Sequence, residues 1–421
     1  MIDPIIGLAL RRPALILLLS AVILGLGIHH YQQLPVDAFP DTSPVLVPIF
    51  AEAHGFAPEE MERLVSFPIE TAMNGLPGVT RIKSTSAFGM AVIYVYFADD
   101  VDIYFARQVV SERLAAVSNQ LPELDTAPAI GPISTGLGQI FLYYLQADPA
   151  IVDCGDKPLD LWLRELNDWV VKYQLQSVPG VTDILAIGGH VLQYQVLVDP
   201  RRLDAHGLGM DDVVTALQTN NRNVGAQFVV MGQEEHLVRG LGLLATLDDL
   251  RQLPLRHDGA SSLSLGDIAD VRYGPELRRG VVTVNGEREV VSGLVLKLYG
   301  ANTSEVIARL HERVVSVQAT LPAGVTLVPY YDQSELVSNA TGTIKKALLQ
   351  GALLVIAVLI LFLGNWRAAL IVAVALPMSA AVAILGMGWQ GLSANLMSLG
   401  GIAIAIGMLG DGTIVMVEAI T

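Results

Sequence analysis

The chain has 421 residues, of which 52% are hydrophobic and only 16% are charged, and its mean hydropathy is +0.50. This composition favours a protein that is partly embedded in a membrane. The net charge of −15 at pH 7 argues against a nucleic-acid partner, and the single cysteine, Cys154, excludes a framework of disulfides within the chain.

The first apolar block, residues 13–32, follows a basic pair, Arg11 and Arg12. A secretory signal peptide would begin in the same way, but no A-x-A-like cleavage site follows, so we expect a retained membrane helix. Basic residues tend to remain on the cytoplasmic side of a membrane. This predicts a cytoplasmic N-terminus over residues 1–12 and an external region after the helix.

The external region contains an internal repeat. Pro-Gly-Val corners occur at Pro77 and at Pro179, and each corner is preceded by a helical pattern and followed by two strand patterns and another helix. Units of this kind predict α+β subdomains of the ferredoxin-like type, although Pro-Gly corners are also common turns. Within the helix expected over residues 58–73, Pro68 should kink or split the helix.

A turn-rich segment, residues 220–275, interrupts the repeated units and carries Gly232, Gly240 and Gly242. Its composition predicts an inserted β-rich module or a projecting arm. A further helix is expected over residues 304–320.

Three more apolar segments follow, at residues 340–363, 368–387 and 395–419. The run between Arg367 and Asp411 contains no Asp, Glu, Lys or Arg. A bilayer core requires about 20 apolar residues per helix, so the segments predict three membrane helices in addition to the first.

The last of these helices carries two acidic residues, Asp411 and Glu418, on a face that also contains Gly400 and Gly407. At 100° per residue these four positions fall within about 40° of arc. The glycines would permit close approach of neighbouring helices and predict a central position in the bundle. An acid held in hydrocarbon is suited to taking up and releasing a proton, whereas the alternative is a structural carboxylate paired with another helix or placed near the interface.

Several stretches resemble the heavy-metal efflux branch of the resistance-nodulation-division (RND) transporters, the CusA/CzcA-type proton-driven pumps. These stretches are Val36–Asp41, Phe67–Met73, Gly75–Gly78, Asp102–Arg107, Ser111–Arg113, Ser134–Gly138, Asn220–Gly225, Tyr331–Glu335 and Asp411–Glu418.

The resemblance implies a multi-pass protein of the bacterial inner membrane with a large periplasmic region. Its fold would be an α-helical membrane bundle, with four membrane helices in this chain, plus periplasmic ferredoxin-like porter subdomains and a docking subdomain. The implied partners are two further copies in a homotrimer, a periplasmic membrane-fusion adaptor and an outer-membrane channel. The implied activity is proton antiport rather than an enzymatic reaction, with no cofactor besides the transported metal ion and protons, and the chain contains no phosphate loop, nucleophile elbow or HExxH motif.

By the same resemblance, the external region divides into a first porter subdomain, a second one in two parts, and a docking subdomain between those parts. The implied bounds are 33–135 for the first, 136–180 and 274–335 for the two parts of the second, and 181–273 for the docking subdomain.

The resemblance also implies that Asp411 belongs to a proton relay, in which Glu418 is a second candidate. Met397 and Met416 match positions that carry methionines along the metal path of copper and silver pumps, and thioether sulfur suits those soft ions. Leu409 departs from that pattern, and Ala405 departs from the pattern of the cobalt-zinc-cadmium type. The physiological metal, in the Cu/Ag or the Zn/Co/Cd/Ni class, therefore stays open.

The chain corresponds to the N-terminal part of a family member, a little under half of one. We therefore expect that residues 1–421 alone do not pump, because a lysine partner for Asp411 would come from the second half. Two alternatives remain: a membrane-anchored fragment that binds a partner without transport, and a drug or lipid exporter of the same superfamily.

Overall fold

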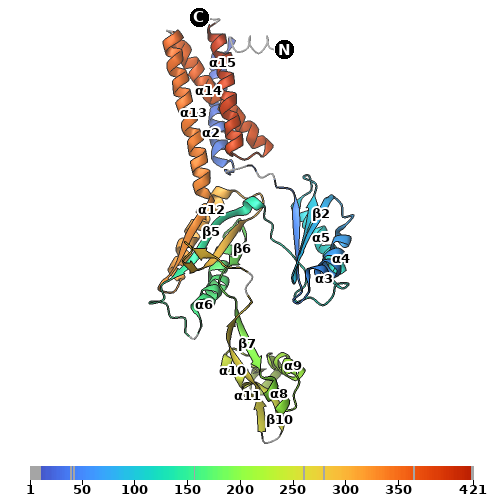
Figure 1. Cartoon of the computed structure of the whole chain (residues 1–421). Helices are drawn as coiled ribbons and strands as arrows, with labels where there is room; N and C mark the ends of the chain where they lie inside the picture. The colour runs from blue at the N-terminus through green and yellow to red at the C-terminus, as the bar shows by residue number, and fades with distance from the viewer. Residues whose placement is uncertain are drawn as a thin grey trace.

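The computed structural model describes residues 11–37, 40, 43–155, 157–258, 261–277, 280–363 and 366–418, although not every side chain within them. Figure 1 shows a bundle of long helices at one end of the molecule. Two α/β bodies lie beside each other next to the bundle, and a third body lies farther from it. Most of the predicted cytoplasmic segment, 1–12, falls outside the described residues.

The first subdomain is a four-stranded antiparallel sheet in the order β2-β3-β1-β4, with helices packed on one face. Strand β3 alternates between buried and half-buried residues, as expected for a strand with one face in the core. Helix α5 begins at a cap formed by Asp102, which accepts hydrogen bonds from the backbone N–H groups of Tyr104 and Phe105. The elements are β1 (Leu46–Glu52), α3 (Pro58–Met61), a π turn (Glu62–Ser66), α4 (Phe67–Met73), β2 (Val79–Ala87), β3 (Met90–Phe97), α5 (Ile103–Ser118) and β4 (Ala129–Ile130).

The predicted interruption of the helix at Pro68 takes the form of a π turn over Glu62–Ser66, directly before α4. A proline inside a regular α-helix would clash with the carbonyl four residues earlier and would leave that carbonyl without its bond. In a π turn the backbone hydrogen bonds join residues five positions apart instead of four, so the proline is accommodated without this clash.

The second subdomain has a sheet in the order β16-β5-β15-β6, which matches the first sheet strand for strand as a βαββαβ unit. The helical segment before its Pro179 corner also contains a π turn, Asn167–Val171, so the internal repeat is confirmed. Its elements are β5 (Gln139–Ala147), α6 (Leu159–Leu166), α7 (Lys172–Gln176), β6 (Val181–Ile187), β15 (Val291–Lys297), α12 (Thr303–Thr320) and β16 (Val325–Asp332).

The sequence reading of the second unit was wrong in one respect. The segment over Leu192–Val198 (β7) was expected to follow β6 as its partner in the repeat, but the partner of β6 is β15. All seven residues of β15 are buried, whereas β7 is half-buried or exposed along its length. Only β15 can therefore occupy an interior position of a sheet with both faces covered.

A third body, which we call the distal module, is inserted between β6 and β15. The predicted docking bounds, 181–273, need correction at their start, because residues 181–187 form β6 and belong to the second sheet. The module core contains Val213, Leu265 and Ile268. Its elements are β7 (Leu192–Val198), α8 (Pro200–Ala205), α9 (Met210–Asn220), β8 (Val224–Met231), β9 (Glu234–Gly240), α10 (Leu247–Arg251), β10 (Pro254–Asp258), β11 (Ser261–Ser264), α11 (Leu265–Ile268) and β12 (Ala269–Pro275); β13 (Thr283–Val284) and β14 (Arg288–Glu289) form a separate short pair.

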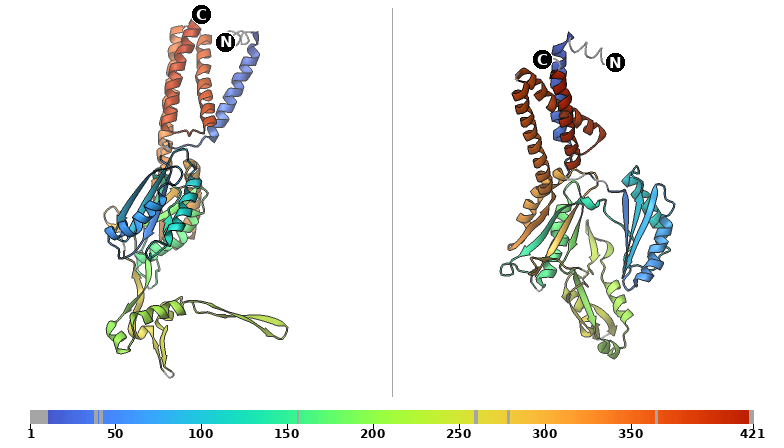
Figure 2. Two further views of the ribbon diagram at one scale, coloured as in Figure 1. Left: turned by 90° about the vertical axis from the view of Figure 1, so that its right-hand side faces the viewer. Right: turned by 45° about the horizontal axis from the view of Figure 1, so that its top comes forward.

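The hairpin of β8 and β9 projects far from the rest of the distal module, as the left view of Figure 2 shows. It is the projecting arm that the turn-rich segment predicted, and we call it the arm.

The bundle consists of α2 (Pro13–Gln33), α13 (Gln333–Leu363), α14 (Trp366–Gln390) and α15 (Leu396–Glu418). Helix α13 follows β16 without a connecting loop, so it starts before the predicted residue 340. Among the described residues, two helical segments are long and apolar enough to cross a membrane, Pro13–Gln33 and Ala373–Gln390, and a shorter apolar helix covers Leu396–Ala405.

Candidate functional site

Helix α15 carries every site residue that the sequence singled out. It starts at an asparagine cap: Asn395 Oδ1 accepts hydrogen bonds from the backbone N–H groups of Met397 and Ser398, at 3.0 and 2.9 Å. The Ser398 hydroxyl in turn accepts the N–H of Asn395 at 2.9 Å. The backbone of Asp411 and Glu418 lies within α15, but the side chains of both lie outside the described part of the chain.

The two candidate metal-path methionines lie near opposite ends of α15. Their side chains are exposed, Met397 to 70% and Met416 to 63%. At 1.5 Å per residue they are separated by roughly 28 Å along the helix. They therefore do not form one metal site.

The glycines of α15 do not bring helices together among the described residues. A Cβ added to Gly400, Gly401 or Gly412 would meet no atom within 4 Å. The close approach occurs instead between α2 and α14, where a Cβ on Gly27 would lie 2.5 Å from Ala381 Cβ. Within the described part of the chain, the face of α15 that carries these three glycines is therefore open, and the expectation that the glycines bring neighbouring helices close stays a prediction.

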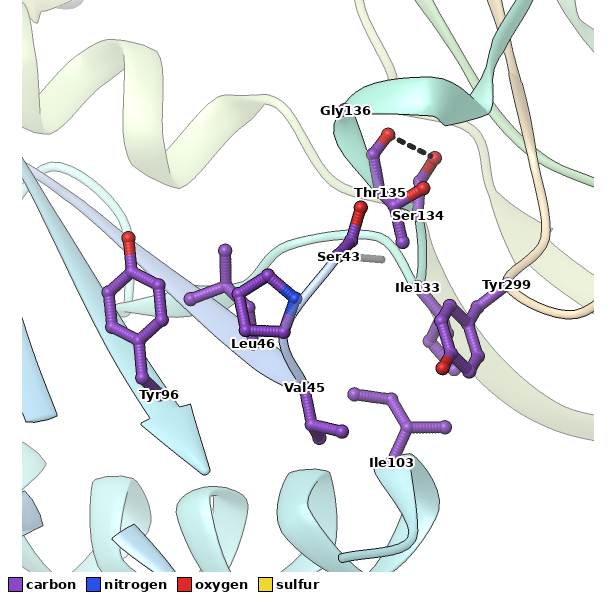
Figure 3. Close-up of a pocket in the computed structure, with 11 residues that line it drawn as sticks. Ser43, Val45, Leu46, Tyr96, Ile103, Ile133, Ser134, Thr135, Gly136 and Tyr299 are labelled. Carbon is purple, nitrogen blue, oxygen red and sulfur yellow. Dashed lines mark hydrogen bonds between the residues drawn. The ribbon is translucent and has the colours of Figure 1, made fainter. Parts of the chain in front are cut away.

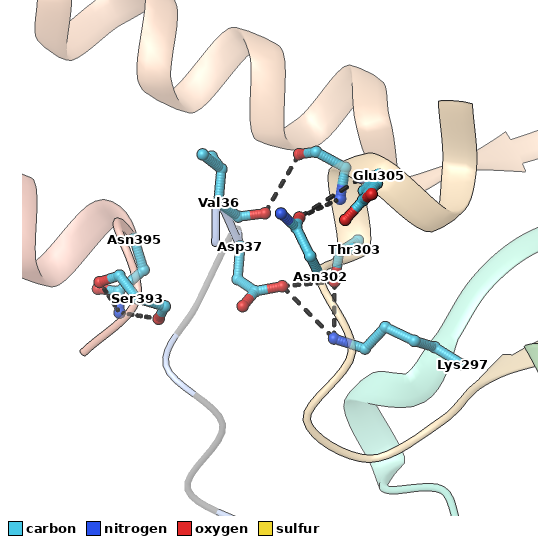
Figure 4. Close-up of polar contacts among 9 residues, drawn as sticks. Val36, Asp37, Lys297, Asn302, Thr303, Glu305, Ser393 and Asn395 are labelled. Atoms are coloured by element: carbon cyan, nitrogen blue, oxygen red, sulfur yellow. Dashed lines mark hydrogen bonds and ion pairs between the residues drawn. The ribbon is translucent and has the colours of Figure 1, made fainter. Parts of the chain in front are cut away.

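A polar cluster joins the helix bundle to the second subdomain, and the sequence reading did not identify it as a site. We call it the junction, and it consists of the side chains of Asp37, Lys297 and Thr303 with the backbone groups of Pro35, Val36 and Ala394. Figure 4 shows Asp37 directed toward Lys297 and Thr303. The Lys297 ammonium lies 3.4 Å from the Asp37 carboxylate and donates to the Thr303 hydroxyl at 2.8 Å. A lysine at the end of an otherwise uncharged, fully buried strand was the available signal, because lysine is seldom buried without a partner.

A cavity of about 220 Å³ lies where the chain passes between the first and second subdomains (Figure 3). Tyr96 and Ile103 of the first subdomain face Ser134, Thr135 and Tyr299 across it. Nearby, the Arg107 guanidinium donates to the carbonyl of Gly131 at 2.6 Å, and burial lowers the pKa of this arginine. Among the described residues that line it, the cavity offers hydroxyl groups but no carboxylate or imidazole.

A wider cleft of about 820 Å³ lies between the two subdomains and contains Glu52, His54, Met90 and Glu276. The His54 imidazole is 2.6 Å from the Asp125 carboxylate. The backbone N–H and then the side chain of His54, through hydrogen bonds, hold the pKa of Asp125 below its ordinary value. The described residues include no group of three or more His, Cys, Asp or Glu side chains that could hold a metal ion.

Comparison with known proteins gives consistent matches along the chain. A family model described as the AcrB/AcrD/AcrF family matches residues 5–421. The cobalt-zinc-cadmium resistance protein CzcA of Cupriavidus metallidurans is 44% identical over 99% of this chain and 39% of its own length. The cation efflux system protein CusA of Escherichia coli is 38% identical over 96% of this chain and 38% of its own length.

A crystal structure of a heavy metal efflux pump superposes with a TM-score of 0.86 at 32% identity, covering 97% of this chain and 40% of that one. The chain thus spans about two fifths of the length of the relatives it matches.

Proposed function

Because the chain belongs to the AcrB/AcrD/AcrF family, which consists of transporters rather than enzymes, we propose that it forms the N-terminal part of a proton-driven pump that exports heavy-metal cations. The observation that carries this proposal is the similarity, over nearly the whole chain, to proteins named for cation efflux and for cobalt, zinc and cadmium resistance.

In this pump, α2, α13, α14 and α15 cross the bacterial inner membrane, and the two subdomains and the distal module lie in the periplasm. Lengths of 21 to 31 residues are sufficient for helices that span about 30 Å of hydrocarbon. Their grouping at one end of the molecule, away from the three α/β bodies, supports this arrangement.

Asp411 is the proton-carrying group of the proposed pump, with Glu418 as a second candidate. The open face at Gly400, Gly401 and Gly412 leaves room for helices from the second half of the pump, and one of these would supply a cation to Asp411. A carboxylate that alternates between an apolar environment and a nearby cation takes up and releases a proton as the helices move.

The pump acts as a homotrimer that delivers metal ions to a periplasmic adaptor and an outer-membrane channel. The arm supports self-association, because Phe228 and Leu237 form a cross-strand pair on it and are exposed to 62% and 59%. A paired, exposed apolar surface of this kind indicates a protein contact.

The test is metal tolerance in a bacterium that lacks its own pump. The complete pump should restore tolerance, the Asp411→Asn variant should abolish it, and Asp411→Glu, which keeps a titratable group, should retain part of it. Residues 1–421 alone should give no tolerance. Full tolerance with Asp411→Asn would exclude proton coupling at this residue, and tolerance to drugs without tolerance to metals would favour a drug exporter.

A further inference from the structure

Successive residues of the segment that follows α2 face two different parts of the molecule. Leu34 and Val36 pack with Ala394 and Leu399 in an apolar cluster at the end of the bundle. The backbone of this segment is fixed to the start of α15, because Ala394 N–H donates to the Pro35 carbonyl at 2.8 Å and Asp37 N–H donates to the Ala394 carbonyl at 3.3 Å. The ends of α2 and α15 are therefore tied to each other.

Asp37 faces the second subdomain from the other side of this segment. Its carboxylate accepts a hydrogen bond from Thr303, the first residue of α12, and pairs with Lys297, the last residue of β15. Lys297 and Thr303 are exposed to only 8% and 2%. The Ser304 hydroxyl adds a bond to the carbonyl of Val36 at 3.2 Å.

These contacts exceed what the local fold of the second subdomain requires. Helix α12 already has its own cap, because Asn302 accepts hydrogen bonds from the N–H groups of Ser304 and Glu305. A buried ion pair is weak support for stability, since desolvation offsets most of the attraction, but it fixes one geometry. Asp37 thus forms a defined link between the helix bundle and Lys297 of the second subdomain, which is 260 residues away in the sequence.

We propose that Asp37, Lys297 and Thr303 form a mechanical joint that makes the second subdomain follow the ends of α2 and α15. The inference rests on the proposed function in one respect, which is that proton binding at Asp411 displaces α15. The joint complements the direct continuation of β16 into α13, so the second subdomain is held to the bundle at two places. Asp37, Lys297 and Thr303 are positioning residues that touch neither metal nor proton.

The joint can be broken without leaving a buried charge. The double variant Asp37→Asn/Lys297→Met removes both charges, and such replacements of a buried pair are often tolerated. The matched control is Lys157→Met/Glu165→Gln, which removes an ion pair of 2.6 Å in the same subdomain but away from the junction.

The measurement is the distance distribution between two spin labels on the 421-residue chain in lipid nanodiscs. With Cys154→Ser as background, the labels are placed at Trp389→Cys near the end of α14 and at Val315→Cys on α12, two exposed positions. We expect one narrow distribution for the parent and for the control, and a distribution at least twofold broader for the double variant. If the double variant does not fold, Thr303→Val replaces it, because this substitution removes the hydroxyl that donates to Asp37 and leaves the ion pair in place, with a smaller broadening expected.

An unchanged width in the junction variant would overturn the proposal. Because neither the labels nor the variants involve Asp411, this result is independent of whether that residue carries protons. In the complete pump the junction variant should also lose at least tenfold in metal-transport rate while its insertion in the membrane is normal. Normal transport together with a broadened distribution would show that the joint is only structural.

Discussion

Ala381 of α14 occupies the space that a side chain on Gly27 of α2 would need, because an added Cβ would lie 2.5 Å from Ala381 Cβ. Gly27 is the buried position among the described residues of α2. The two helices approach each other here as closely as their backbones allow, as small residues permit in membrane bundles.

We therefore expect that Gly27→Ala lowers the free energy of unfolding by about 1–3 kcal/mol, which is typical of overpacking in a close-packed interior. The measurement is thermal unfolding in detergent, followed by tryptophan fluorescence. The control is Gly25→Ala on the same helix, where the added Cβ meets no atom within 4 Å and no loss is expected. Equal effects of the two substitutions would contradict the packing argument.

Tyr143→Phe should destabilise the second subdomain. The Tyr143 hydroxyl donates to Asn167 Oδ1 at 2.9 Å, and both residues are fully buried. Removing the donor leaves a buried amide oxygen without this bond, at a cost of about 1–3 kcal/mol. Chemical unfolding of the parent and of the exposed control Tyr173→Phe would measure the difference, and a loss as small as that of the control would refute the assignment.

The same tyrosine should make the protein sensitive to alkali. Burial, and to a smaller extent the Asp168 carboxylate, raise the pKa of Tyr143 above its ordinary value. The pKa of Tyr143 is thus higher in the folded than in the unfolded chain. The stabilisation that the protonated hydroxyl contributes is therefore fully present below about pH 10 and is lost as the pH rises further. Stability measured between pH 9 and pH 11.5 should therefore fall more steeply for the parent than for Tyr143→Phe, and parallel curves would rule this out.

The arm should be necessary for self-association. Phe228→Asp/Leu237→Asp places two like charges directly opposite each other on its exposed surface, and we expect the trimer to dissociate to monomers. Light scattering coupled to size-exclusion chromatography gives the mass of the assembly. Ile151→Asp, at an equally exposed position of the second subdomain, is the control. A trimer that survives the double substitution would show that the arm is not a subunit contact.

The methionines of α15 should affect the choice of metal. If the pump carries Cu(I) or Ag(I), Met397→Leu and Met416→Leu should each lower tolerance to these ions several-fold, because leucine has a similar volume but no sulfur ligand. Met408→Leu on the same helix, exposed to 73%, should have no effect. Equal tolerance in all three variants would leave these methionines with a packing role and would favour a divalent cation.

The open glycine face of α15 separates what helical geometry determines from what depends on neighbouring helices. The arc of Gly400, Gly407, Asp411 and Glu418 follows from helical geometry alone. Which neighbour covers such an arc depends on the helices that are present, and among the described residues close glycine contacts between bundle helices occur at Gly27 and Gly388, where α2 meets α14.

The sequence by itself determined the features that depend on neighbouring residues. The apolar segments, the interruption at Pro68, the repeated corners and the helix ending at Thr320 all follow from periodicity and local sterics. Only the tertiary structure decided that β6 pairs with β15, beyond the distal module, and that Asp37 meets Lys297. These contacts join residues that are far apart in sequence. They form because a buried strand needs both of its faces covered and a buried ammonium needs a charged partner. A local sequence pattern shows the need for such a partner but cannot identify which distant residue supplies it.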